Sequence, residues 1–224
     1  MLKKTLTLAT IAALACNCAL ADGDTPQAQN TYPKNATGQI TFDGYVTLPG
    51  VIVKVITDEK DAVINTGLNG KTIIMAVPDV DVATLKTTPS NDEMASGNSR
   101  NFRIELEGYT VGSSGVMTAE VKVSGTSVSD QNKSIFVNQT PPEKGGASGV
   151  GVRLRYKGIY DDSTPAVFTN GDSLVGTFNE AYATKLGRNA NYAFHFDAAI
   201  VAVSPADVSA GHVTSTVDVV VNYK

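Results

Sequence analysis

Apolar and polar residues alternate in short segments along residues 38–224, and clusters of Gly, Asn, Asp, Ser and Pro separate the segments. A period of two places every second side chain on the same face of an extended strand. The alternating segments are 40–43, 102–107, 120–124, 150–157, 192–200 and 216–223. A further segment, 51–56, is apolar at both parities except at Lys54, which predicts a strand buried on much of both faces. About nine or ten strands at this spacing predict an all-β fold in which two sheets pack as a sandwich.

Helical periodicity is weak along the chain, and only residues 82–85 and 180–186 are expected to form single helical turns. Residues 78–101 are rich in Thr, Ser, Asn and Asp, which is typical of an exposed loop. Because no internal repeat or linker interrupts residues 38–224, we expect them to fold as one domain.

The first residues have the pattern of a secretory leader. Lys3 and Lys4 supply positive charge, residues 6–15 are mostly apolar, and residues 19–21 read Ala-Leu-Ala, as a cleavage site requires. We expect residues 1–21 to be a signal peptide and the mature chain to begin at Asp22. Since the apolar run is too short to span a bilayer, the protein is expected to be exported.

Both cysteines of the chain, Cys16 and Cys18, lie inside this leader. The alternative interpretation of the leader is a lipoprotein cleavage site that leaves Cys16 lipidated, with Ala13 where such sites usually carry Leu. Under the main interpretation the mature chain has no cysteine, which excludes disulfides, a thiol nucleophile and thiolate metal ligands. Stability must then come from burial, which a chain of about 200 residues can provide.

Charge and side-chain spacing exclude several classes of function. Removal of Lys3 and Lys4 with the leader takes the formal net charge from −4 to −6, and no basic patch suits a nucleic acid partner. His195 and His212 lack the spacing of a zinc site. The glycine-rich residues 145–151 lack the Lys-Ser or Lys-Thr ending of a phosphate loop. Without a G-x-S-x-G motif, the sequence predicts no enzyme, no cofactor and no metal site.

Four motifs occur in order along the chain: GQITFDGYV at 38–46, FRIEL at 102–106, GASGVGVRL at 146–154 and VDVVVNYK at 217–224. Their order and content resemble the subunits of chaperone–usher fimbriae (pili), in particular the type 1 fimbrial-like major pilins. That family usually carries two cysteines, at places held here by Gly50 or Val51 and by Tyr109. The chain is therefore similar to a divergent, cysteine-free member, lengthened around residues 78–100.

The resemblance implies an incomplete immunoglobulin-like β-sandwich that lacks its last strand. A donor strand from a neighbouring subunit would complete it in a groove beside the C-terminal strand. The residues expected in this groove and in the chaperone contact are Val217, Val219, Val221, Tyr223 and Lys224. The implied partners are other pilin subunits, a periplasmic chaperone and an outer-membrane usher, on a route through the periplasm to the cell surface. The alternative for residues 213–223 is an ordinary central strand.

Residues 22–37 are polar and lack a strong periodicity. We expect them to form an N-terminal donor-strand extension ahead of a pilin domain at 38–224. The donor positions that share one parity are Ala28, Tyr32, Ala36 and Gly38. Asn30 and Lys34 fall on the same parity and weaken the pattern. The alternative for residues 22–37 is a disordered tail.

The predicted function is that of a structural subunit of a surface fimbria that polymerises by donor-strand exchange and supports bacterial adhesion. The first alternative is an adhesive subunit, whose exposed loop at 78–100 or 158–172 binds a host glycan or protein receptor. The candidate residues for such a site are Tyr109, Tyr160 and Tyr182. A secreted β-sandwich enzyme is the remaining alternative, which the missing catalytic constellation disfavours.

Overall fold

The computed structural model describes residues 35–46, 52–57, 72–87, 99–110, 116–125, 129, 132–162, 164–187 and 190–223. Strands dominate these ranges, and the prediction of an all-β sandwich is confirmed. The strands are β1 (Asn35–Val46), β2 (Ile52–Ile56), β3 (Thr72–Asp81), β4 (Ser99–Thr110), β5 (Met117–Gly125), β6 (Ile135–Val137), β7 (Val150–Gly158), β8 (Ala166–Val167), β9 (Ser173–Phe178), β10 (Asn191–Ala202) and β11 (Gly211–Tyr223). The helical segments are α1 (Val82–Thr87), α2 (Glu180–Leu186) and the 3-10 turns η1 (Pro142–Lys144) and η2 (Pro205–Asp207).

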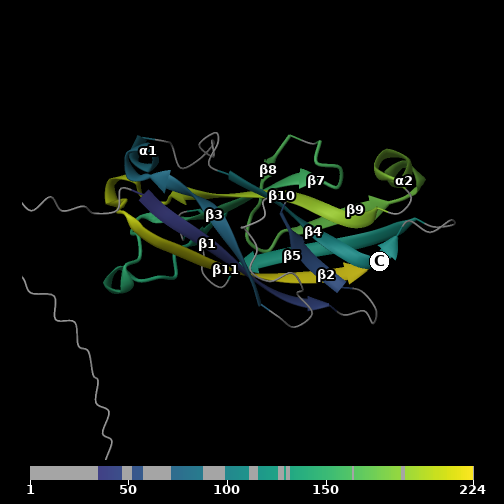
Figure 1. The fold of residues 1–224 in the computed structure, drawn as a ribbon, viewed down its shortest axis with the longest axis horizontal. Helices are drawn as coiled ribbons and strands as arrows, with labels where there is room; N and C mark the ends of the chain where they lie inside the picture. The colour runs from purple at the N-terminus through teal and green to yellow at the C-terminus, as the bar shows by residue number, and fades with distance from the viewer. Residues whose placement is uncertain are drawn as a thin grey trace, which may run out of the picture. The chain divides into compact units, whose positions relative to one another are not determined.

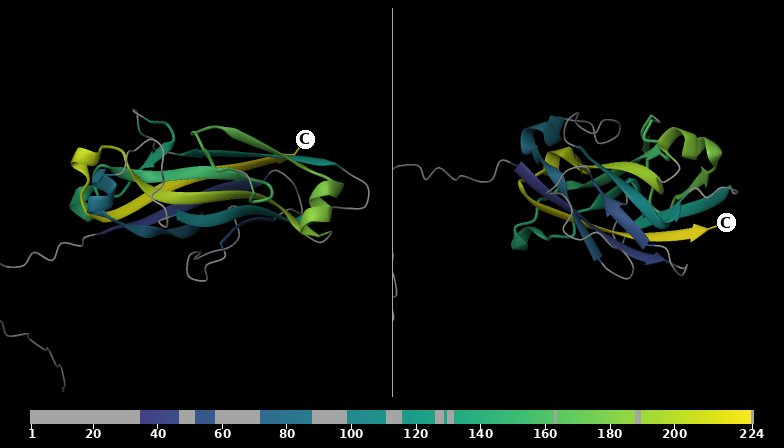
Figure 2. Two further views of the ribbon diagram at one scale, coloured as in Figure 1. Left: turned by 90° about the horizontal axis from the view of Figure 1, so that it is seen from above. Right: turned by 45° about the vertical axis from the view of Figure 1, so that its right-hand side comes forward.

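The strands form two sheets (Figures 1 and 2). The five-stranded sheet has the order β3-β1-β11-β5-β9, and the six-stranded sheet has the order β2-β4-β10-β7-β6, with β8 beside β7. Among the described strands every pairing is antiparallel except that of β1 with β11. The purple β1 and the yellow β11 run side by side in Figure 1, so the first and the last described strands are neighbours.

The alternation read from the sequence has placed the core side chains correctly on β1. Ile40 and Phe42 are fully buried, whereas Gln39 before them is exposed and Thr41 between them is partly exposed. Phe42 lies 5.2 Å from the ring of Phe102 on β4, which in turn stacks on Phe196 of β10 at 5.3 Å. These aromatic contacts cross from one sheet to the other, so β1 is packed into the core of the sandwich.

The helical turns predicted at 82–85 and 180–186 are confirmed by α1 and α2. The Asn179 side chain caps α2 by accepting hydrogen bonds from the backbone N–H groups of its first turn. In the described residues no helix has the length and apolarity needed to cross a membrane.

The exposed loop expected at 78–101 is wrong at both ends. β3 continues to Asp81, α1 follows directly, and β4 begins at Ser99; residues 88–98 lie outside the described part of the chain. The physical reason is burial, because Val80 and Leu85 reach the core from within this polar stretch. Two apolar residues are enough to anchor backbone that the overall composition assigns to a loop.

Candidate strand-exchange site

The C-terminal strand β11 has a strand of its own chain on both sides. β1 pairs with it in parallel, from Ala36 opposite Gly211 to Val46 opposite Val221. On the other side, β5 pairs with its second half. The predicted open groove beside the C-terminal strand is therefore wrong for the single chain. An unpaired strand edge next to an exposed apolar face is unfavourable, and β1 has the apolar parity needed to cover it.

The predicted groove residues lie on β11 with the expected parity. Val217, Val219 and Val221 face the core and are buried. The backbone of Tyr223 is paired with β5 at the end of the strand. The Tyr223 side chain and the whole of Lys224 lie outside the described part of the chain. The three valines form an apolar seat, and in the single chain β1 is the strand that occupies the adjacent position.

The predicted donor positions are Ala28, Tyr32, Ala36 and Gly38. The first two lie outside the described residues, whereas the last two belong to β1 and stand opposite β11. β1 starts at Asn35, so the strand crosses the boundary that was expected after residue 37. The sequence signal for this is the alternation itself. The parity of Ala36 and Gly38 continues through Ile40 and Phe42 without a break.

Gly38 brings β1 close to the opposite sheet. A Cβ atom at this position would lie 2.7 Å from Ile200 Cδ1 and 3.3 Å from Val77 Cβ. Ile40 and Phe42 follow on the same face, and full burial of a side chain of this size contributes about 1.5–3 kcal/mol. One face of β1 therefore holds the strand in the sandwich.

The direction of β1 weakens its backbone pairing. Parallel pairing is slightly less stable per residue than antiparallel pairing, because its hydrogen bonds are slanted. On its other side β1 pairs in the antiparallel direction with β3, but the register is irregular between Ala36 and Gly38. The site thus combines an apolar seat, which favours a strand beside β11, with a backbone direction that is not the most stable one.

The tyrosines considered for an adhesive site are placed differently from one another. The Tyr109 side chain lies outside the described part of the chain. The rings of Tyr160 and Tyr182 lie 5.5 Å apart, and Lys185 Nζ is 4.4 Å from the centre of the Tyr160 ring while it pairs with Asp162. Tyr182 is fully buried, and burial raises its pKa to about 12. Tyr182 is therefore an anchor of α2 and not a residue that an external ligand reaches.

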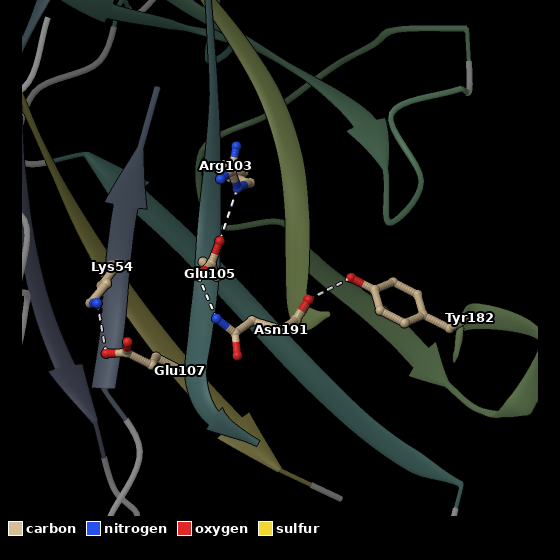
Figure 3. A network of polar contacts seen from close by, with 6 residues as sticks. All are labelled: Lys54, Arg103, Glu105, Glu107, Tyr182 and Asn191. Atoms are coloured by element: carbon tan, nitrogen blue, oxygen red, sulfur yellow. Dashed lines mark hydrogen bonds and ion pairs between the residues drawn. The ribbon is translucent and has the colours of Figure 1, made fainter. Parts of the chain in front are cut away.

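A polar network connects α2 to the six-stranded sheet (Figure 3). Tyr182 Oη donates to the carbonyl oxygen of Asn191 at 2.7 Å, and Asn191 Nδ2 donates to Glu105 Oε1 at 2.7 Å. Arg103 Nε in turn donates to Glu105 Oε2 at 2.9 Å. Figure 3 also shows a separate ion pair between β2 and β4. Partly exposed ion pairs contribute about 0–1 kcal/mol each. The network therefore serves to position α2 against the sheet.

The two histidines lie in different sheets, His195 on β10 and His212 on β11. Within the described ranges, no group of three or more His, Cys, Asp or Glu side chains is placed to hold a metal ion. The buried Asp197 is bound by Arg155 through two hydrogen bonds, of 2.9 Å from Nε and 2.7 Å from the terminal nitrogen. This carboxylate is therefore engaged by a structural ion pair.

No protein-family model and no curated protein matches the chain. Among solved structures, one similar chain comes from a study of a chaperone–tip adhesin complex in CFA/I fimbriae biogenesis, with 10% identity and a TM-score of 0.33 over 78% of this chain and 68% of that chain. Another is the CupB6 tip adhesin from Pseudomonas aeruginosa, with 10% identity and a TM-score of 0.29 over 83% of this chain and 84% of that chain. The contacts within the chain itself carry the functional assignment below.

Proposed function

We propose that this protein is a structural subunit of a surface fimbria that polymerises by exchanging β1 between copies. The observation that carries the proposal is the parallel pairing of β1 with β11, which makes the first described strand and the last strand neighbours. A strand from a second copy can enter beside β11 once β1 has been released, because the edge of β11 and its apolar seat are then uncovered.

β1 lies between β11 and β3 in the five-stranded sheet, so its departure frees one edge of each of these strands. It is the first described strand, and the next one, β2, belongs to the other sheet. Its departure leaves β11 still paired with β5 and exposes the buried valines of the apolar seat. An exposed edge of this kind pairs readily with a strand from another chain.

Exchange of β1 between copies produces a filament. Each copy donates its first strand to one neighbour and accepts a strand beside its last strand from another. A contact of this head-to-tail kind does not close on itself, so it adds subunits indefinitely. The secretory leader and the pilin-like motifs support a route through the periplasm, where a chaperone covers the β11 edge and an usher at the outer membrane directs assembly. The product is a binding and structural filament, and no enzymatic step is involved.

The test is a cross-link that prevents β1 from leaving. Thr41 of β1 stands opposite Thr216 of β11, and neighbouring strand positions lie within the Cα separation of about 4.4–6.8 Å that a disulfide requires. The mature chain without its leader has no other cysteine, so the double variant T41C/T216C forms only this bond. We expect the oxidised variant to stay monomeric and the reduced variant to form filaments, as seen by negative-stain electron microscopy after mild denaturation and refolding at high protein concentration.

The matched control is T118C/T177C, because Thr118 of β5 and Thr177 of β9 also face each other on neighbouring strands of the same sheet. This cross-link leaves β1 free, so the oxidised control should assemble like the unmodified chain. Filaments of oxidised T41C/T216C in the same amount as those of the control would overturn the exchange of β1.

The adhesive alternative has one observation in its favour, the partly exposed Tyr160 with Lys185 over its ring. An aromatic ring and a cation beside each other are common parts of a ligand-binding surface. Glycan-array binding by the oxidised T41C/T216C monomer, lost in Tyr160→Ala, would support it. Because Tyr182 is buried, the cluster offers one accessible aromatic ring, and we favour the structural subunit.

A further inference from the structure

The two halves of β11 are held in different ways on the side away from β1. The second half, from Val217 onward, pairs with β5. The first half, Gly211 to Thr216, is covered instead by residues 136–147, which begin within β6 of the other sheet and include η1. An isolated parallel bridge between Gly146 and His212 marks this contact.

Residues 136–147 form hydrogen bonds with both the N–H and the carbonyl group of β11 at two positions, His212 and Thr214. His212 N–H donates to the Gly145 carbonyl at 2.9 Å, and its carbonyl accepts from Ala147 N–H at 2.9 Å. Thr214 C=O accepts from Gln139 N–H at 2.7 Å. The remaining group, Thr214 N–H, donates at 2.8 Å to a side chain, the amide oxygen of Asn138.

The Asn138 side chain acts as a substitute for a neighbouring peptide group. Its Nδ2 donates at 2.8 Å to the His212 carbonyl and at 2.8 Å to the Ala147 carbonyl. Its Oδ1 accepts from Thr214 N–H and, at 2.9 Å, from Thr140 N–H. A single planar amide therefore bonds the strand β11 and both sides of the loop that covers it.

The loop and β11 can lie this close because a glycine without a side chain stands on each side of the contact, Gly146 in the loop and Gly211 in β11. A Cβ atom on Gly146 would stand 1.9 Å from the carbonyl oxygen of Thr140, and one on Gly211 would stand 2.6 Å from the backbone nitrogen of Ala147. Both obstacles are backbone atoms, which cannot move aside as the end of a flexible side chain can. The contact is thus built into the backbone path and fastened by Asn138.

We propose that Asn138 is the positioning residue of the acceptor strand: it holds the first half of β11 in place from the side opposite β1, so that β11 remains a template when β1 leaves. The inference rests on the proposed exchange of β1. When β1 departs, the first half of β11 retains only this contact beside it, whereas the second half retains β5. Loss of the Asn138 side chain should therefore destabilise the first half of β11 more after β1 has left than while β1 is in place.

This role predicts that Asn138→Ala slows the uptake of a replacement strand, whereas a destabilising change elsewhere should leave the uptake unchanged or make it faster. A variant weakened far from β11 releases β1 more easily and should accept a replacement strand at the same rate or faster. Asn138→Ala also lowers stability, but it removes hydrogen bonds that keep the empty seat ordered. Because all four hydrogen bonds of the Asn138 side chain are lost together, capture of a strand should fall by about tenfold or more.

The experiment uses the full mature chain and a fluorescent synthetic peptide with the sequence of residues 35–46. Uptake of the peptide is followed by fluorescence anisotropy, for the unmodified chain, Asn138→Ala and Tyr182→Phe. Tyr182→Phe is the control, because it removes one buried hydrogen bond, to the Asn191 carbonyl at 2.7 Å, in α2 and away from β11. Urea is added to bring the control and Asn138→Ala to the same free energy of unfolding.

We expect Tyr182→Phe to take up the peptide at least as fast as the unmodified chain, and Asn138→Ala to take up about tenfold less. Thr140→Val gives a milder variant should Asn138→Ala not fold. It removes only the hydroxyl contact of 2.6 Å between Thr140 and Thr214, and it should reduce uptake in the same direction by a smaller factor.

The outcomes separate the two proposals. Uptake by the unmodified chain together with equal uptake by Asn138→Ala, Thr140→Val and the control overturns the role of Asn138 and leaves the exchange of β1 standing. The other outcome is that the unmodified chain takes up no peptide under conditions in which amide hydrogen exchange reports that β1 is released. That result overturns the exchange itself and the role of Asn138 with it.

Discussion

At Gly38 the lack of a side chain decides how closely β1 approaches the opposite sheet. The position is buried, and the atoms that a Cβ would meet belong to Ile200 and Val77. A sequence pattern registers this glycine only as a weak point in a strand, because glycine adds no apolar surface. In the structure it is the residue that allows the face of β1 with Ile40 and Phe42 to pack into the core.

Gly38→Ala should destabilise the chain by about 1–3 kcal/mol, because the added methyl group overpacks the contact with Ile200. Urea unfolding measures the change, with Gln39→Ala as the control, since that exposed neighbour should stay within about 0.5 kcal/mol of the unmodified chain. Ile200→Val shortens the obstructing side chain, so the double variant should lose less than the two single losses together. Strictly additive losses would show that this contact is not the cause.

Tyr156 and Tyr182 link stability to alkaline pH. Burial raises the pKa of each from the ordinary value of 10.0 to about 12. In the unfolded chain these tyrosines lose their protons from about pH 10, whereas the folded chain keeps them, so the unfolded state binds fewer protons as the pH rises. Their contribution to stability is therefore complete below pH 10 and is lost as the pH rises towards 12.

We expect the free energy of unfolding in urea to fall between about pH 10 and pH 12. Tyr156→Phe removes one of the two titrating hydroxyls, so it should make this fall smaller, while Tyr160→Phe serves as the comparison on a less buried ring. The same pH dependence in Tyr156→Phe and in the unmodified chain would contradict the assignment.

At the scale of elements, β1 is the strand that we propose to be exchanged. The expected donor extension at 22–37 and the expected domain at 38–224 meet inside this strand, which runs from Asn35 to Val46. The buried apolar side chains described on this strand are Ile40 and Phe42, near its middle. We therefore propose the donor role for β1 as a whole.

Deletion of residues 22–34 should leave both folding and filament formation intact, because β1 remains complete. Deletion of residues 22–46 should instead give a chain that folds only when the peptide of residues 35–46 is added. Circular dichroism reports the folding, and electron microscopy reports the filaments. Loss of filaments from the shorter deletion would return the donor role to residues 22–34.

At the scale of the molecule, the neighbouring positions of β1 and β11 connect fold and assembly. One strand covers the seat within a chain, and the same strand on another copy can cover it between chains. The fully buried core side chains of β1 make the empty seat costly. Under the proposed exchange, a monomer and a filament differ chiefly in whose β1 lies beside β11.

The sequence by itself determined the class of fold, the two helical turns and the parity of the strands. These properties depend on residues close together in the chain, because side-chain alternation and capping by residues such as Asn179 act over a few positions. The buried valines of β11 and the buried pair on β1 were assigned to the right faces for this reason.

Only the tertiary structure decided which strands became neighbours. The parallel pairing of β1 with β11 joins residues some 175 positions apart, and no local pattern carries information on that choice. The same holds for Asn138, whose amide reaches His212 and Thr214 across the fold, and for the burial of Tyr182, which the sequence left among the exposed candidates. Pairing and burial depend on the free energy of the whole packed chain, in which an uncovered edge beside an apolar face is avoided by whichever segment fits it best.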